Sequence, residues 1–101
     1  MLKKPYPDAF FAINDDTAIG ILYTAKHMGF RVPDDISICG FTNGDRSKAC
    51  DPLLTTVDQR GTQVGKKAAE ILIGLVEGSH PMGKTVHGMV RTSLVIRGTT
   101  K

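Results

Sequence analysis

The amino-acid sequence predicts an α/β fold with a parallel sheet, on the basis of three observations. Two short apolar runs, AFFAI at residues 9–13 and ISICGF at residues 36–41, are separated by a segment with helical spacing of its apolar residues. Apolar runs without polar alternation are typical of strands that are covered on both faces. Strand, helix and strand within roughly 30 residues form a βαβ unit, which is nearly always right-handed and parallel.

The first helix is expected to run from about Asp16 or Thr17 to Met28. Asp15, Asp16 or Thr17 can cap its amino end, with Asp16 preferred, and Gly29 follows at the position where a left-handed residue commonly ends a helix. The expected core-facing stripe consists of Ala18, Ile21, Leu22, Ala25 and Met28. A second apolar line, Ile19 and Tyr23, points away from that stripe, and from the residues alone it is either scattered surface apolarity or a subunit interface.

The remaining chain alternates loops with regular segments. The loop TNGDRSKACDP at residues 42–52 is long enough to suggest function, and LLTTVDQ at residues 53–59 is expected to be extended. A second helix is predicted from about Thr62 to Glu77, with Gly78 beyond it. Its apolar stripe comprises Val64, Ala68, Ile71, Leu72 and Leu75. EGSHPMGK is expected to be a loop, and residues 85–96 are expected to form one or two strands.

Composition excludes several classes of protein. The 101 residues suffice for one domain or less, and 41% hydrophobic with 23% charged residues is ordinary for a globular chain. No apolar segment approaches the ~20 residues of a membrane span, and MLKKPYPD is not followed by the apolar h-region of a signal peptide, so we expect no export signal, no membrane partner and a cytoplasmic location. The net charge of +3 is scattered, and the two cysteines and three histidines share no ligand spacing, so neither a metal nor a cofactor is expected.

A candidate site lies where the predicted strands end. Ligands of open parallel sheets bind beyond the carboxyl ends of the strands, which here are Asn14–Asp15 and Thr42–Asn43. Their amide, carboxylate and hydroxyl groups suit a polyhydroxylated or other polar small ligand. No histidine or lysine is placed to activate Thr42, so we expect no catalytic residue and no enzyme. The two adjacent aspartates are more consistent with capping, or with capping by one and ligand contact by the other, than with acid–base catalysis.

Five segments in this order resemble the C-terminal part of lactose-repressor (LacI/GalR) family transcription regulators: PDAFFAINDDTAIGIL, GFRVPDDISICGF, DPLLTTVDQ, VGKKAAEILIGLVEG and SLVIRGTT. The resemblance implies part of a periplasmic-binding-protein-like, Rossmann-like effector domain, in which crossing strands join two α/β subdomains. Residues 1–57 would belong to the C-terminal effector-binding subdomain, residues 58–96 to the N-terminal one, and residues 97–101 to the return crossover and tail. The chain would then be a fragment of one two-subdomain core.

The resemblance also implies ligand-binding residues. The matching positions are Asn14, Asp15, Thr42, Asn43 and Gln59. Many members of the family carry an aspartate where this chain has Thr42. Because Thr42 and Asn43 are neutral, either the ligand differs or the nearby Asp45 compensates.

The partners implied by the resemblance are a small-molecule effector, preferably a sugar, and a second copy of the chain. The helix that follows the Asn-Asp motif lies at the family's dimer interface, which favours an interface at Ile19, Tyr23, Ala49 and Cys50. Exposed sheet edges in so short a chain also predict self-association. Operator DNA would be bound only through a helix-turn-helix that this sequence does not contain. A fragment of a periplasmic sugar- or solute-binding protein is the alternative interpretation.

Overall fold

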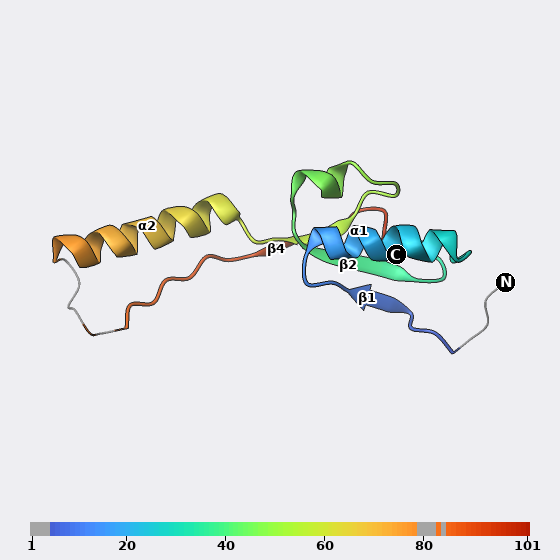
Figure 1. The fold of residues 1–101 in the computed structure, drawn as a ribbon, viewed down its shortest axis with the longest axis horizontal. Coiled ribbons are helices and arrows are strands. Elements are labelled where there is room, and N and C mark those ends of the chain that lie inside the picture. The colour runs from blue at the N-terminus through green and yellow to red at the C-terminus, as the bar shows by residue number, and fades with distance from the viewer. Residues whose placement is uncertain (1–4, 79–82, 84) are drawn as a thin grey trace.

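The protein has an α/β fold, seen in a computed structural model that describes residues 5–78, 83 and 85–101 (Figure 1). Its elements are β1 (Ala9–Phe11), α1 (Asp15–His27), β2 (Ser37–Thr42), the 3-10 helix η1 (Asp45–Lys48), β3 (Thr55–Asp58), α2 (Gly61–Glu77) and β4 (Ser93–Val95). They form one sheet in the order β1-β2-β3-β4, in which β1, β2 and β3 are parallel and β4 is antiparallel to β3. The predicted fold class, a βαβ unit in a largely parallel sheet, is confirmed.

Helix α1 is capped by Asn14, and the prediction that Asp16 caps it is wrong. Asn14 has extended backbone angles, and its Oδ1 accepts a hydrogen bond from the Thr17 amide at 2.8 Å. Asn14 is therefore the N-cap, while Asp15 and Asp16 lie in the first helical turn, where carboxylates complement the helix dipole. At the other end Gly29 has φ +93°, which confirms the left-handed residue predicted after the helix.

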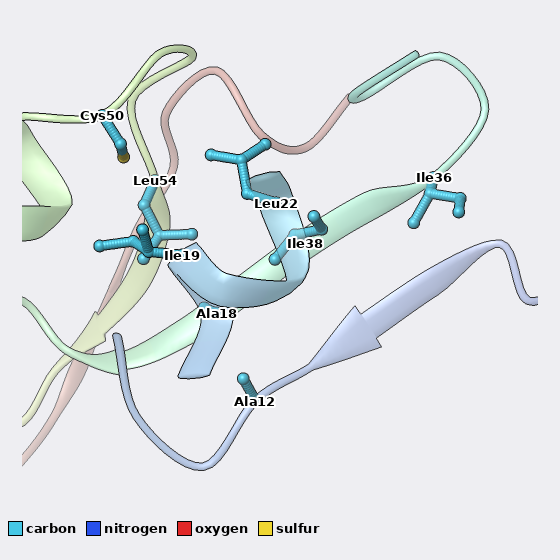
Figure 2. Packing of buried hydrophobic residues seen from close by; sticks show 8 residues of the cluster. All are labelled: Ala12, Ala18, Ile19, Leu22, Ile36, Ile38, Cys50 and Leu54. Atoms are coloured by element: carbon cyan, nitrogen blue, oxygen red, sulfur yellow. The ribbon is translucent and has the colours of Figure 1, made fainter. Parts of the chain in front are cut away.

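The hydrophobic core lies between α1, the sheet and the loop that follows β2 (Figure 2). It consists of Ala12, Ala18, Ile19, Leu22, Ile36, Ile38, Cys50 and Leu54. Two predictions about α1 are wrong. Ile19 does not point away from the core, because its side chain is only 3% exposed, and Met28 is not a core residue, because it is 54% exposed. The reason is that η1 and the loop around Cys50 fold back over α1, so the helix is covered over a face that includes Ile19.

The face of β1 that points away from α1 is exposed to solvent in the described part of the chain. Phe11 is 70% exposed and Ile13 is 80% exposed, so the prediction that the AFFAI run is covered on both faces is wrong for this structure. Helix α1 packs on one face of the sheet, and β1 is hydrogen-bonded to β2 on one side only. An apolar run therefore predicted the strand correctly but not its surroundings.

Helix α2 and the segment leading into β4 form an arm that extends from the rest of the molecule (Figure 1). The predicted apolar stripe of α2 is mostly exposed, and only Gly74 is buried. Gly88 lies against the helix, because a Cβ there would come within 3.2 Å of Lys67 and Ile71, and Val90 lines a small pocket together with residues of α2. Within the predicted tail strands only β4 is regular, and most of the predicted EGSHPMGK loop lies outside the described residues.

No helix among the described residues is long and apolar enough to cross a membrane. In the same part of the chain, no group of three His, Cys, Asp or Glu side chains is arranged to hold a metal ion.

Candidate functional site

A polar pocket of about 250 Å³ lies at the carboxyl ends of β1 and β2. It is lined by Asn14, Asp15, Asp16, Thr42, Gly44, Asp45 and Arg46. Three of the predicted ligand-binding residues, Asn14, Asp15 and Thr42, therefore lie together. Their convergence follows from the parallel pairing of β1 with β2, which places the residues after both strands at the same edge of the sheet.

Asn14 is an exposed residue of this pocket and is also the cap of α1. The side-chain oxygen Oδ1 of Asn14 accepts a hydrogen bond from the Thr17 amide. An amide side chain also carries two N–H donors and a second lone pair on its oxygen. Asn14 can therefore bind a hydroxyl group of a ligand without giving up its capping bond.

Asp15 is buried, with 5% of its surface exposed, and both of its carboxylate oxygens are held by the protein. The Thr56 hydroxyl donates to Oδ1 at 2.6 Å, and the Gly44 amide donates to Oδ2 at 2.8 Å. The carboxylate thus joins the start of α1 to β3 and to the turn after β2. Burial raises the pKa of the nearby Cys39 thiol, and the negative charge of Asp15 raises it further.

The turn after β2 has an unusual backbone, and its two residues differ in their surroundings. Thr42 has φ +138° and Asn43 has φ +62°, both on the left-handed side that side chains rarely adopt. Thr42 lines the pocket, whereas the Asn43 side chain accepts a hydrogen bond from the Arg97 guanidinium at 2.7 Å and one from the Ser47 hydroxyl at 3.5 Å. Asn43 is thus placed by contacts within the chain and is not part of the pocket lining.

Gln59 follows β3 directly, and it is half-buried. Thr42 pairs with Asp58 in the sheet, so Gln59 lies just beyond that pair at the same edge. It does not line the pocket formed by the other predicted residues.

Sequence reasoning missed three residues that shape this region: Arg46, Thr56 and Arg97. Arg46 donates to Asp16 at 2.7 Å on the pocket rim, where both side chains are about two-thirds exposed, so solvent screens the pair strongly. Thr56 and Arg97 stood in the quoted segments LLTTVDQ and SLVIRGTT, but Thr56 bonds to Asp15, 41 residues away, and Arg97 bonds to Asn43, 54 residues away. Only the tertiary structure brings them to the site.

The lining chemistry favours binding over catalysis. Carboxylate, amide, hydroxyl and guanidinium groups meet at this pocket, and together they can donate to and accept from several ligand hydroxyls. None of the residues that line it pairs a nucleophile with a basic histidine or lysine.

A larger, apolar groove of about 610 Å³ lies between β1 and α1. It is lined by Tyr6, Pro7, Phe10, Thr17, Gly20, Ile21, Thr24, Ala25, Met28, Phe30 and Ile36. This lining offers few polar groups to orient a hydroxylated ligand, and none of the predicted ligand-binding residues belongs to it. The smaller polar pocket is therefore the candidate ligand site.

Of the four residues predicted at a subunit interface, two are exposed and two are buried. Tyr23 is 52% exposed and Ala49 is exposed, so both are accessible to a partner. Ile19 and Cys50 are 3% and 6% exposed, and both belong to the core of this chain. The prediction that Ile19 faces outward is wrong, because the loop after β2 covers it.

Comparison with known proteins gives consistent results over almost the whole chain. Residues 1–100 match the family described as periplasmic binding protein-like domain. The HTH-type transcriptional repressor CytR of Escherichia coli strain K12 is 39% identical over 100 residues, which cover 99% of this chain and 28% of the repressor. The chain therefore spans about 28% of the length of this curated relative.

Solved structures show the same relationship. A LacI-type transcription regulator from Bifidobacterium animalis subsp. lactis DSM 10140 has a TM-score of 0.84 and 33% identity, with 94% of this chain and 33% of that chain covered. A LacI family transcriptional regulator from Arthrobacter sp. FB24, in complex with lactose, has a TM-score of 0.83 and 30% identity, with 93% and 35% covered. These relatives favour the regulator interpretation over the solute-binding alternative. The chain belongs to the periplasmic binding protein-like domain family, in the form found in LacI-type transcriptional regulators.

Proposed function

We propose that this chain supplies part of the sugar-binding cleft of a LacI-type transcriptional regulator. The observation that carries the proposal is the convergence of Asn14, Asp15 and Thr42 in one polar pocket at the carboxyl ends of parallel strands. The Arthrobacter relative, whose structure was determined with lactose, supports a sugar as the ligand class. The role is regulatory and not enzymatic, and operator binding through a helix-turn-helix would take place in the cytoplasm.

The pocket is one wall of a larger cleft in this proposal. Its volume of about 250 Å³ is below the ~300–1,000 Å³ of typical small-molecule sites. A second subdomain facing the carboxyl ends of β1–β3 would enclose the ligand and bring Gln59 to it. The subdomain boundaries at residues 1–57, 58–96 and 97–101 stay a prediction.

The lining suggests how a sugar would be oriented. Asp16 and Asp45 provide acceptors, Arg46 provides donors, and Asn14 provides both. Thr42 supplies a neutral hydroxyl where many relatives are expected to have a carboxylate. Asp45 then stands close enough to share the acceptor role, since it lines the same pocket.

A substitution that separates capping from ligand binding tests this function. Asn14→Ser keeps a good helix cap but removes the amide, so lactose affinity measured by calorimetry should fall by roughly 2- to 10-fold, the equivalent of a hydrogen bond worth ~0.5–1.5 kcal/mol. Asn14→Ala, as the comparison variant, should also lose helix stability. Cellobiose and arabinose, titrated in parallel, test other sugars. Absence of binding to all three sugars by an intact regulator that contains this chain, or unchanged affinity in its Asn14→Ser variant, would contradict the proposal.

We also propose that the chain self-associates, preferably as a homodimer. Exposed Tyr23 on α1 and exposed Ala49 beside η1 are the accessible members of the predicted interface. The exposed side chains of Phe11 and Ile13 around the β1 edge add apolar surface that a second copy can cover. Sedimentation velocity at high micromolar concentration should show a dimer or larger species, and a compact monomer would contradict this proposal.

A further inference from the structure

We propose that Asp15 and Arg97 are positioning residues, which hold the turn at residues 42–44 against the two chain segments that lead to and from the α2 arm. This inference rests on the proposed function, because the turn is the part of the candidate sugar site that carries Thr42. It assigns Asp15 a role different from the direct ligand contact predicted from sequence. It also gives a role to Arg97, which lies outside the pocket lining.

The groups around Asp15 accommodate a buried carboxylate. Its two oxygens accept from the Thr56 hydroxyl and from the Gly44 amide, as described above. Gly40 of β2 makes room for it, since a Cβ at that position would collide with Asp15 Oδ1. A carboxylate that is 5% exposed and bonded on both oxygens is well suited to fixing backbone and poorly suited to reaching a ligand.

The Arg97 side binds the same turn from the returning segment. Its guanidinium donates to Asn43 Oδ1 at 2.7 Å, to the Leu54 carbonyl at 2.9 Å and to the Ser47 hydroxyl at 3.1 Å. Its backbone amide donates to the Thr55 hydroxyl at 2.8 Å. Arg97 thereby joins the segment after β4 both to β3 and to the turn.

The Thr56 hydroxyl connects the two sides. It donates to Asp15 and accepts from the Asn43 amide at 3.3 Å. Asn43 is therefore held at its backbone by β3 and at its side chain by Arg97. Because Thr42 and Asn43 both have positive φ angles, the turn is an unfavourable conformation that needs such external bonds to persist.

The arrangement has a consequence for ligand binding. β3 leads directly into α2, and β4 leads directly back to Arg97, so the bonds that Thr56 and Arg97 make to the turn come from the two segments that connect the arm to the body. A displacement of these segments would move Asn43 and, with it, the Thr42 hydroxyl in the pocket. Sugar affinity should then depend on Asp15, Thr56 and Arg97, although Thr56 and Arg97 do not line the pocket.

Hydrogen exchange in the ligand-free full chain tests the positioning role directly. In Asp15→Ala the Gly44 amide should exchange at least tenfold faster, and in Thr56→Val the Asn43 amide should do the same, because each amide loses its acceptor. Thr56→Ser, which keeps the hydroxyl, should restore slow exchange. The Ile38 amide, which donates to the Thr99 carbonyl in the body, is the internal reference. Equal acceleration at Ile38 and at the turn would mean global unfolding and would overturn the inference.

Lactose calorimetry provides the second arm of the test. Arg97→Met and Thr56→Val should each weaken binding at least threefold, with rescue by Thr56→Ser. Asp35→Asn should not change it, because Asp35 precedes the amino end of β2 and the pocket lies at the carboxyl end. Affinity unchanged in Arg97→Met and Thr56→Val while the turn amides exchange faster would overturn the positioning role. If an intact regulator that contains this chain binds no sugar, the proposed function fails. Exchange at the Gly44 amide in the Asp15 variant and at the Asn43 amide in Arg97→Met then decides whether Asp15 and Arg97 hold the turn.

Discussion

The packed body and the α2 arm of this molecule both contain helices with periodic apolar residues, but only the body buries them. In the body, formed by α1, β1–β3 and η1, the side chains of Leu22, Ile38 and Leu54 are fully buried. In the arm, Leu72 and Val76 of α2 are 62% and 80% exposed. Figure 1 shows the reason, because the body consists of layers, whereas α2 is accompanied by a single returning segment.

This difference shows what an apolar stripe can predict. Periodic apolar residues indicated both helices, and both formed with boundaries within a few residues of those expected. The same periodicity did not reveal which surface covers each stripe. The surface that covers such a stripe can come from another part of the fold, from a second copy or from a further segment. For α1 it comes from the sheet and from the loop after β2.

The largest effect is expected from a charge placed at matched isoleucines of the two regions. Ile19→Asp should destabilise the body by about 4 kcal/mol or more, because Ile19 is 3% exposed and the new carboxylate would be buried without a partner. Ile73→Asp in α2 should change the free energy of unfolding by less than about 0.5 kcal/mol, since Ile73 is 54% exposed. Urea denaturation followed by circular dichroism measures both. Similar losses in the two variants would show that α2 is covered as well as α1 is.

An intermediate effect is expected from alanine at matched glycines. Gly40→Ala should cost about 1–3 kcal/mol, because its Cβ would collide with Asp15 and would lie 3.0 Å from the Leu54 side chain. Gly65→Ala in α2 meets no atom within 4 Å and should raise local helix stability by up to ~1 kcal/mol. Thermal unfolding with amide exchange resolved along the chain separates the two. A tolerated Gly40→Ala would contradict the close packing of β2 against α1.

The smallest effect concerns an exposed turn of the body and depends on pH. Side-chain and backbone hydrogen bonds from Arg31 hold the pKa of Asp35 below its usual value of 3.8. The stabilisation is therefore fully present above pH 3.8 and is lost as the pH falls through the lowered pKa. Asp35→Asn should be slightly less stable than the unaltered chain at pH 5–7, and the two should converge as the pH falls below 3.8. A difference that is independent of pH would show that the negative charge of Asp35 does not stabilise the fold.

Much of the candidate site could be predicted because it follows from strand order. Once two parallel strands are adjacent, the residues after them must share one edge of the sheet, and Asn14, Asp15 and Thr42 do line one pocket. The role of each residue in the site was harder to predict from the sequence. The cap proved to be Asn14 in place of Asp16, because capping depends on backbone angles at one residue and several neighbours have suitable side chains.

The sequence by itself determined the α/β class, the two helices, the glycines that end them and the family. These features depend on local periodicity, on turn residues and on the order of short segments, which can all be read along the chain. Tertiary structure alone decided the burial of Ile19, the inward-facing bonds of Asp15 and the joining of Arg97 to Asn43. Those contacts link residues 29 to 54 positions apart, and their geometry depends on how the loop after β2 and the returning segment pack together.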